Sequence, residues 1–242
     1  MEVHHHSHHG KKKWTEYFWE FFMLFLAVTL GFFVENQREH YIEHQRAKKY
    51  AKQMYNDLKK DTGYYNFLIA DIGQYVTSFD TVNALFDISP PVSNQRLIAA
   101  LLPKRSTYPV VLVSTTFNQM RSSGSLRYFS NDSLSNKISE YYEFTHPMIH
   151  KATDYANDFF TKEIQSFMLD HFDYNESDYQ TDKLKVADPK YIDRNPKTDI
   201  LIRNRFVLYN SLLKFNIDKP VPYALNEAKK LLDLLKKEYT LK

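Results

Sequence analysis

Residues 14–34 decide the fold class, and their sequence is WTEYFWEFFMLFLAVTLGFFV. The part from Phe21 to Val34 has no charged side chain, but a helix needs about 20 residues to cross a bilayer. Extension back to Trp14 adds aromatic side chains that suit a membrane–water interface, at the cost of including Glu16 and Glu20. As a helix the whole stretch rises about 30 Å, so we predict a transmembrane helix over residues 14–34.

Three other interpretations of this segment are weaker. A buried helix of a soluble protein, or a helix lying in the membrane plane, would need a polar face, and Phe21–Val34 has almost none. A cleaved signal peptide would need a small-x-small site, which Phe32–Asn36 does not offer. The sequence therefore favours an uncleaved signal anchor.

The orientation of the span follows from the charges beside it. Lys11, Lys12 and Lys13 precede the span, whereas Arg38 is the basic residue nearest to its other end. More basic residues follow from Arg46 onward, so local counting is not decisive, but large domains translocate largely regardless of charge. We predict a His/Lys-rich cytoplasmic tail over residues 1–13 and an extramembrane domain over residues 35–242.

Composition excludes several classes of site. The chain of 242 residues has no cysteine, which removes disulfides, thiolate zinc sites and cysteine nucleophiles. Only 5 glycines argue against a Gly-rich phosphate-binding loop. The formal net charge of +3 does not indicate nucleic-acid binding, and the five histidines between His4 and His9 are expected to capture metal only adventitiously. We predict no cofactor, no metal site and no nucleic-acid partner.

A stripe of apolar residues predicts that the transmembrane helix continues as a long stalk helix to about residue 87. Its members recur in steps of three and four, apart from one double step over Asp61: Ala47, Ala51, Met54, Leu58, Tyr65, Ile69, Ile72, Val76, Phe79, Val82 and Phe86. Gly63 and Gly73 mark places where this helix can bend. The segment Ile88–Pro91 should end it.

Further helices are expected in the rest of the chain. Short ones are predicted at Arg96–Leu102, capped by Ser93, and from Thr115 or Thr116 to Arg121, ended by Ser122-Ser123-Gly124; a short strand is an alternative for Val110–Val113. A longer helix should open at Asn131 or Asp132 and kink or break at Pro147, and Asp173–Lys197 should form a loop.

Two apolar faces predict the last helices. One comprises Ile202, Phe206, Tyr209 and Leu213, and the other comprises Leu225, Ala228, Leu232, Leu235 and Tyr239. The connector Asn216–Pro222 is short, so we expect these helices to pack antiparallel. The predicted fold class is mostly α: one N-terminal transmembrane helix, a stalk helix and an extramembrane helical bundle.

The candidate interaction site is a face of the transmembrane helix. Glu20, Ala27 and Gly31 share one side of a helix, and small residues four apart let another helix approach closely. An ionisable residue in a span usually faces protein or water, although Glu20 lies near enough to the end to reach the headgroups. We predict contact here with another membrane subunit or a second copy of the chain.

Two histidine pairs were considered as catalytic or metal sites. His40, Glu43 and His44 fit the H-x-x-E-H pattern of some zinc proteases, but no third ligand is identifiable and we interpret the segment as a solvated helix. His146 and His150 are also four apart, but Pro147 is expected to disturb the helix between them. We therefore predict no catalytic residue.

Two parts of the chain carry recognisable motifs. The first comprises the opening Met1–His6, the lysine patch and the span ending Phe25–Glu35, and the second comprises Thr115–Arg127 followed by Leu134–Tyr142. In these parts the chain resembles a family of uncharacterised single-pass membrane proteins of Bacteroidetes. This resemblance implies a bacterial inner-membrane protein with a helical domain, here periplasmic. It implies no activity.

These observations favour a non-enzymatic interaction protein, a subunit or accessory of an inner-membrane or envelope complex. Its expected partners are the lipid bilayer and other membrane subunits, or a second copy of the chain. A ligand-binding or sensory helical module on a membrane stalk is the alternative, since bundles bind small molecules between helices. A membrane-tethered metallohydrolase using His40, Glu43 and His44 is the least favoured hypothesis.

Overall fold

The computed structural model describes residues 13–89, 91–101, 110–173 and 190–241. The chain divides into two compact units, residues 1–49 and 50–242. The predicted tail 1–13 lies outside the described residues except for Lys13, and so do its histidines.

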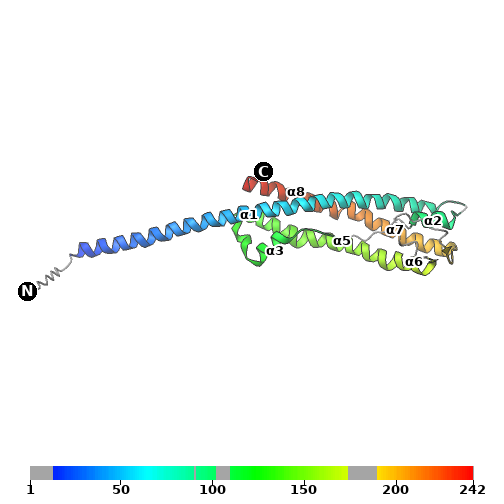
Figure 1. Cartoon of the computed structure of the whole chain (residues 1–242), viewed down its shortest axis with the longest axis horizontal. Helices are drawn as coiled ribbons and strands as arrows, with labels where there is room; N and C mark the ends of the chain where they lie inside the picture. The colour runs from blue at the N-terminus through cyan, green and yellow to red at the C-terminus, as the bar shows by residue number, and fades with distance from the viewer. Residues whose placement is uncertain (1–12, 90, 102–109, 174–189, 242) are drawn as a thin grey trace, which may run out of the picture. The chain divides into compact units, whose positions relative to one another are not determined.

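The described chain is helical almost throughout (Figure 1). Its elements are α1 (Trp14–Leu85), α2 (Asn94–Leu101), α3 (Thr115–Ser122), a 3₁₀ turn (Ser125–Tyr128), α4 (Asp132–Glu140), a π segment (Tyr141–Thr145), α5 (His146–Phe159), a second π segment (Phe160–Gln165), α6 (Ser166–His171), strands β1 (Phe172–Asp173) and β2 (Lys190–Tyr191), α7 (Pro196–Asp218) and α8 (Pro220–Tyr239). The two strands pair antiparallel with Phe172 opposite Tyr191. The mostly α prediction is confirmed.

Helix α1 runs from the apolar segment through the predicted stalk without interruption. Neither Gly63 nor Gly73 ends it, since both lie inside the continuous helix. The helix ends at Leu85, shortly before Ile88–Pro91 as predicted. The expectation that helix continues through at least Leu58 is confirmed.

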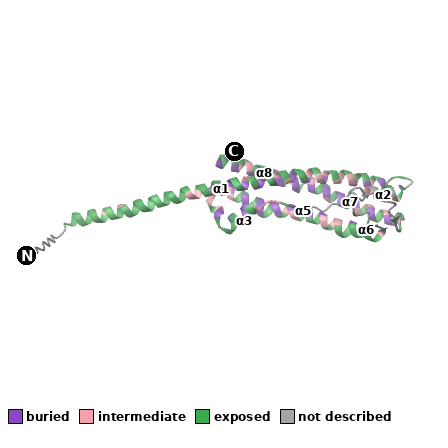
Figure 2. Cartoon of the chain, viewed as in Figure 1, coloured by how far each residue is buried: buried purple, intermediate pink, exposed green. Residues whose placement is uncertain are grey.

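In the first unit, no described residue from 13 to 46 is buried. The large apolar side chains of the span are exposed, as the green ribbon of Figure 2 shows: Trp14, Phe18, Trp19, Phe21, Met23, Leu24, Phe25, Val28, Leu30, Phe32, Phe33 and Val34. Within the described residues, α1 is the helix long and apolar enough to cross a membrane. An exposed apolar surface of this extent is costly in water and fits a lipid environment.

The second unit packs three helical columns around one core (Figure 2). The first is α1 from residue 50 onward, the second runs from α4 to α6, and the third comprises α7 and α8. Most of the predicted α1 stripe faces the core, with Ala51, Met54, Leu58, Tyr65, Ile72, Phe79 and Val82 buried. Ile69, Val76 and Phe86 are only half-buried, whereas Leu68 and Leu85, which the predicted stripe did not include, are buried. Aromatic contacts fasten the columns together: the Phe79 ring stacks on Phe206 at 5.5 Å and meets Tyr209 edge-on at 5.2 Å.

The prediction that the last two helices pack antiparallel is wrong. The Tyr209 ring of α7 contacts Phe160, whereas the Tyr239 ring at the end of α8 contacts Phe129, just before α4. The chain therefore runs in a single direction through the third column, and α8 continues the direction of α7. Lys219 alone separates the two helices, and one residue is too short a connection to reverse the chain.

Pro147 does not break its helix, contrary to prediction. The π segment Tyr141–Thr145 precedes it, and the His146 N–H donates to the Tyr141 carbonyl five residues back. Proline clashes with the carbonyl four residues before it in a regular α-helix, and the wider π turn moves that carbonyl away. The helix therefore continues through Pro147 into α5.

The helix ends agree with the predictions in three places out of four. Ser93 Oγ accepts from the Arg96 N–H, Asn131 Oδ1 accepts from the Leu134 N–H, and Gly124 after α3 has a φ of 65°. Neither Thr115 nor Thr116 caps α3, because Ser114 precedes the helix and the Thr116 hydroxyl donates to Asp57 instead. The alternative strand over 110–113 does not form either.

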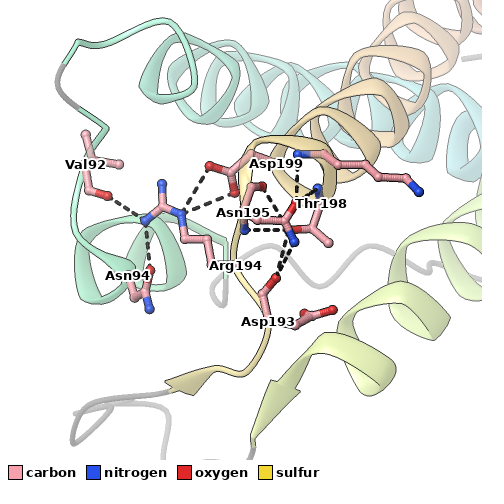
Figure 3. A network of polar contacts seen from close by, with 8 residues as sticks. Val92, Asn94, Asp193, Arg194, Asn195, Thr198 and Asp199 are labelled. Atoms are coloured by element: carbon pink, nitrogen blue, oxygen red, sulfur yellow. Dashed lines mark hydrogen bonds and ion pairs between the residues drawn. The ribbon is translucent and has the colours of Figure 1, made fainter.

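A polar brace fixes the start of α7 to the segment before α2 (Figure 3). Arg194 Nη1 donates to the Val92 carbonyl at 2.6 Å and to Asn94 Oδ1 at 2.8 Å, and its Nε donates to the Asp199 carboxylate. Asn195 caps α7 with a capping box to Thr198. These bonds close the end of the bundle where α1 terminates.

Candidate functional site

The predicted interaction face lies on the first unit. Glu20, Ala27 and Gly31 all belong to α1 and are exposed, and helical spacing places them on one side. A Cβ added at Gly31 would meet nothing within 4 Å, so the surface there is open. Contact of this face with another helix stays a prediction.

The H-x-x-E-H segment also lies on α1. His40 Nδ1 is 3.9 Å from the Glu43 carboxylate, and His40 and His44 are exposed. Among the described residues, no three His, Asp or Glu side chains lie close enough together to hold a metal ion. The metallohydrolase hypothesis therefore gains no geometric support.

The second unit contains a polar cluster inside its core, which we call the Asp61 cluster. Its members are nine-tenths or more buried: Asp57, Asp61, Tyr65, Thr116, Tyr141, Tyr142 and His146. Three of them stand one helical turn apart on α1, because positions 57, 61 and 65 are separated by four residues. A buried carboxylate is stable only when donors surround it.

Asp61 has those donors. The Val113 N–H donates to its Oδ1 at 2.8 Å, and the Tyr141 hydroxyl donates to its Oδ2 at 2.9 Å. His146 Nε2 lies 2.9 Å from the same Oδ2. An ionised carboxylate only accepts hydrogen bonds, so Nε2 of His146 must carry the hydrogen in this arrangement.

The neighbouring polar groups extend this network. Asp57 Oδ2 accepts from both the backbone N–H and the hydroxyl of Thr116, which holds the first turn of α3. The Tyr65 hydroxyl is 3.2 Å from that of Tyr141, so a chain of hydrogen bonds leads from Tyr65 through Tyr141 to Asp61. Burial is the main cause that raises the pKa of Tyr65 and of Tyr141 above the ordinary tyrosine value.

The π segment and the residue after it supply several side chains of the cluster. Tyr141 and Tyr142 are both buried, and so are Thr145 and His146. Residues four apart share a helix face, so these two adjacent pairs lie on one side of the helix. π segments are frequent at functional sites.

An open hollow lies beside the cluster. It has a volume of about 480 Å³, and its lining comes from α3 with Ser114 before it, and from the π segment and α5: Ser114, Phe117, Asn118, Arg121, Tyr142, Glu143, His146, Pro147 and His150. The Phe117 and Tyr142 rings stack at 4.7 Å and form an aromatic wall. His146, whose Nε2 lies 2.9 Å from Asp61, is part of this lining.

Tyr142 leaves one polar atom unsatisfied. Its hydroxyl is buried and has no hydrogen-bond partner in the described part of the chain. Burial, followed by the charges of Asp61 and Asp57, raises the pKa of this tyrosine, so the hydroxyl stays protonated. A buried polar group without a partner costs free energy.

Part of this site is predictable from the sequence. The double step in the α1 stripe falls on Asp61, which occupies a core position between Leu58 and Tyr65. An acidic residue at a core position of the stripe is the signal for a buried carboxylate. The prediction that Pro147 disturbs the helix between His146 and His150 is wrong, and both histidines line the same hollow.

Comparison with models of protein families, with curated proteins and with solved structures finds no match to this chain. The resemblance to single-pass proteins of Bacteroidetes therefore stays a prediction.

Proposed function

We propose that this chain is a non-enzymatic, membrane-anchored interaction protein, a subunit or accessory of a bacterial inner-membrane complex. Helix α1 supplies the candidate anchor, since its N-terminal part is apolar and exposed. In this proposal the N-terminus is cytoplasmic and the helical domain is periplasmic. A reporter fused after Lys242 that is active only in the cytoplasm would reverse this orientation.

The observation that carries the proposal is an apolar stripe on α7. Leu201, Leu208 and Phe215 are 38%, 50% and 56% exposed. They are seven residues apart, so they share one side of the helix, while residues such as Phe206 and Leu213 bury the other side in the core. An exposed apolar stripe at this spacing suits the apolar face of a partner helix.

The test compares charged substitutions on and off the stripe. Full-length protein is purified from native membranes in mild detergent as wild type, Leu208→Glu, Phe215→Glu and Asn226→Glu. Asn226 is an exposed residue of α8, outside the α7 stripe, and serves as the control. We expect stoichiometric subunits with wild type and Asn226→Glu, and their loss with the two stripe variants.

Two outcomes would count against the proposal. Purification of the wild type without any stoichiometric partner, and without self-association, would remove the basis for a subunit role. Retention of the same partners by both stripe variants would show that α7 is not the docking surface. Circular dichroism of each variant separates loss of binding from loss of helix.

A ligand-binding module is the second candidate function. The observation that favours it is the hollow beside the Asp61 cluster, whose lining includes the stacked Phe117 and Tyr142 rings and the His146 ring bound to Asp61. Convergent polar groups on an aromatic wall are typical of small-molecule sites. A bound molecule found by mass spectrometry of the purified protein would support this candidate.

A further inference from the structure

We propose that a second copy of this chain docks on the face that α1 and α7 share in the second unit, which we call the α1–α7 face. The four helices of the two copies then form an antiparallel bundle around a two-fold axis. The inference rests on the proposed subunit role, and it names the partner of the α7 stripe. It uses the shape, the charge and the extent of this face.

Two rows of residues line the outer side of the face, away from the core. Each repeats in steps of three and four, which is the spacing of a seam between packed helices. The outer row of α7 comprises Leu201, Asn204, Leu208, Ser211 and Phe215, all exposed. The outer row of α1 comprises Asn66, Ala70, Gly73, Thr77, Asp80 and Ala84, all exposed except the half-buried Gly73.

Contacts between the two helices place the rows next to each other. Asp80, a member of the α1 row, accepts from Asn210 at 2.7 Å and from Lys214 at 2.8 Å. Each of these two donors directly precedes a member of the α7 row. Arg203 lies 2.8 Å from Asp87, just past the end of α1, so the two helices are antiparallel. The rows therefore form one continuous two-helix face.

The side chains of the two rows are complementary in size. The α1 row is made mostly of small residues, whereas Leu208 and Phe215 of the α7 row are 50% and 56% exposed. A Cβ added at Gly73 would meet nothing within 4 Å, so packing inside one copy does not explain a glycine that costs about 1 kcal/mol in a helix. The Thr77 hydroxyl donates to the Gly73 carbonyl at 3.0 Å, so its burial leaves no unsatisfied hydroxyl. The large side chains of one α7 thus fit over the small residues of the other copy's α1.

The charge of the α1–α7 face suits self-association. A two-fold axis brings identical patches together, so a patch of one sign would repel itself. Among the exposed residues from 66 to 84, all of which the structure describes, Asp80 alone is charged, and Lys214 neutralises it. The exposed side of α8 instead has a net positive charge: Lys229, Lys230, Asp233, Lys236, Lys237 and Glu238. Depletion of charge is typical of the centre of an interface.

The extent of the face is close to what a stable dimer needs. Residues 66–84 rise about 27 Å, and two neighbouring helices are about 20 Å wide, which gives a flat projection of about 540 Å². The accessible surface is larger than this projection, because side chains protrude from it. A standard stable interface buries about 800 Å² on each partner. The face is therefore of the size class of a stable protein–protein interface.

A two-fold axis along the bundle agrees with two anchors in one membrane. Each α7 then packs beside the other copy's α1, antiparallel as it is within one copy. Tyr50, where the second unit begins, lies at the same end of the dimer in both copies. An axis across the bundle would place these two residues at opposite ends, which two anchors in one membrane do not allow.

Disulfide crosslinking tests this arrangement, because the chain has no cysteine of its own. Thr77 and Ser211 are exposed members of the two rows, and the contact between Asp80 and Asn210 places them at about the same height in the bundle. We expect oxidation of full-length Thr77→Cys/Ser211→Cys in native membranes to move most of the chain to a covalent dimer on a non-reducing gel. Each single variant should stay monomeric, because the axis places like helices diagonally.

Two further variants serve as controls. Asp154→Cys with Ser211→Cys keeps one cysteine and moves the other to an exposed position of α5, outside the α1–α7 face, so it should give no dimer. Leu208→Glu added to Thr77→Cys/Ser211→Cys should abolish the crosslink, because it introduces a charge at the centre of the apolar row. Circular dichroism shows whether each variant keeps its helices.

Three results would overturn the inference: no covalent dimer with the cysteine pair, equal crosslinking of the pair and the Asp154 control, or equal crosslinking by Ser211→Cys alone. Failure of this inference differs from failure of the proposed subunit role. Recovery of a different stoichiometric subunit together with a single copy of the chain would overturn the dimer and leave the subunit role in place.

Discussion

Tyr141 and Tyr142 are adjacent residues whose hydroxyl groups have different surroundings. The Tyr141 hydroxyl donates to the Asp61 carboxylate at 2.9 Å, whereas that of Tyr142 has no partner among the described residues. Both rings are buried and touch His146 edge-on at 4.8 Å. The energetic role of a hydroxyl in this core therefore depends on its hydrogen bonds and not on burial.

Removing these two hydroxyls should have unequal effects on stability. Tyr141→Phe should lower the free energy of unfolding by about 2 kcal/mol, because a hydrogen bond to a charged group is lost. Tyr142→Phe should leave it unchanged or raise it slightly, because the hydroxyl that is removed satisfies no partner. Urea unfolding of both variants, followed by circular dichroism, checks the difference, and equal losses would contradict it.

The Asp61 cluster shows what a single sequence can and cannot provide. The α1 periodicity places Asp61 on the core face, so burial of a carboxylate was within reach of sequence reasoning. Its partners were not, because Val113, Tyr141 and His146 lie 52, 80 and 85 residues away along the chain. Periodicity describes one helix at a time and does not pair distant segments.

Among the helices, existence and type were predictable, and connections were not. Long apolar stripes predicted α1, α4, α5, α7 and α8, and side-chain caps predicted the starts of α2 and α4. The direction of α8 depends on the length of the connector, which was predicted as seven residues and is one residue in the structure. Pro220 and Pro222 are compatible with either length, since proline is tolerated in the first turn of a helix. The spacing of the apolar residues did not indicate the π segment Tyr141–Thr145.

Two glycines should respond in opposite ways to the same substitution. Gly63→Ala should raise the free energy of unfolding by about 1 kcal/mol, because Gly63 is inside α1 and its new Cβ meets nothing within 4 Å. Gly124→Ala should lower it by about 1 kcal/mol, because Gly124 has a φ of 65°. Thermal unfolding of the two variants checks the signs. Stabilisation by both would show that the turn after α3 tolerates a side chain.

The span should associate through its small-residue face. We expect a disulfide crosslink in membranes between cysteines introduced at position 27, or from there to a partner subunit, since Ala27 and Gly31 are exposed on one side of α1. Gly31→Leu should weaken it, because the added side chain keeps the two backbones apart. A crosslink that the leucine does not affect, or none at all, would leave the anchor a passive tether.

For the second unit as a whole, buried tyrosines couple folding to high pH. Burial raises the pKa of Tyr65, Tyr141 and Tyr142 above the ordinary value of about 10. The unfolded chain therefore releases these protons at a lower pH than the folded chain does. The contribution of these protonated tyrosines to the free energy of unfolding is fully present below about pH 10 and is lost as the pH rises above it.

The expected loss is steep. These three groups together should lower the free energy of unfolding by about 4 kcal/mol per pH unit above about pH 10 while they stay protonated in the fold. Burial also raises the pKa of Tyr64, Tyr191 and Tyr239, which add to the fall. Tyr142→Phe should remove its own share, about 1.4 kcal/mol per pH unit. Tyr155→Phe is the control, because Tyr155 is 63% exposed and should leave the slope unchanged. Equal slopes in the two variants, measured by urea unfolding, would contradict the assignment.

The long separation between α1 and the column that covers it has a consequence for synthesis on the ribosome. Asp80 is hydrogen-bonded to Asn210, 130 residues later in the chain. At translation rates of about 5 to 20 residues per second, α1 emerges roughly 6 to 26 seconds before that contact can form. During this interval the apolar side of α1 lacks the helices that bury it in the folded protein. Asp61 lacks the hydrogen-bond donors of the second column. A nascent chain in this state is a natural client for a holding chaperone.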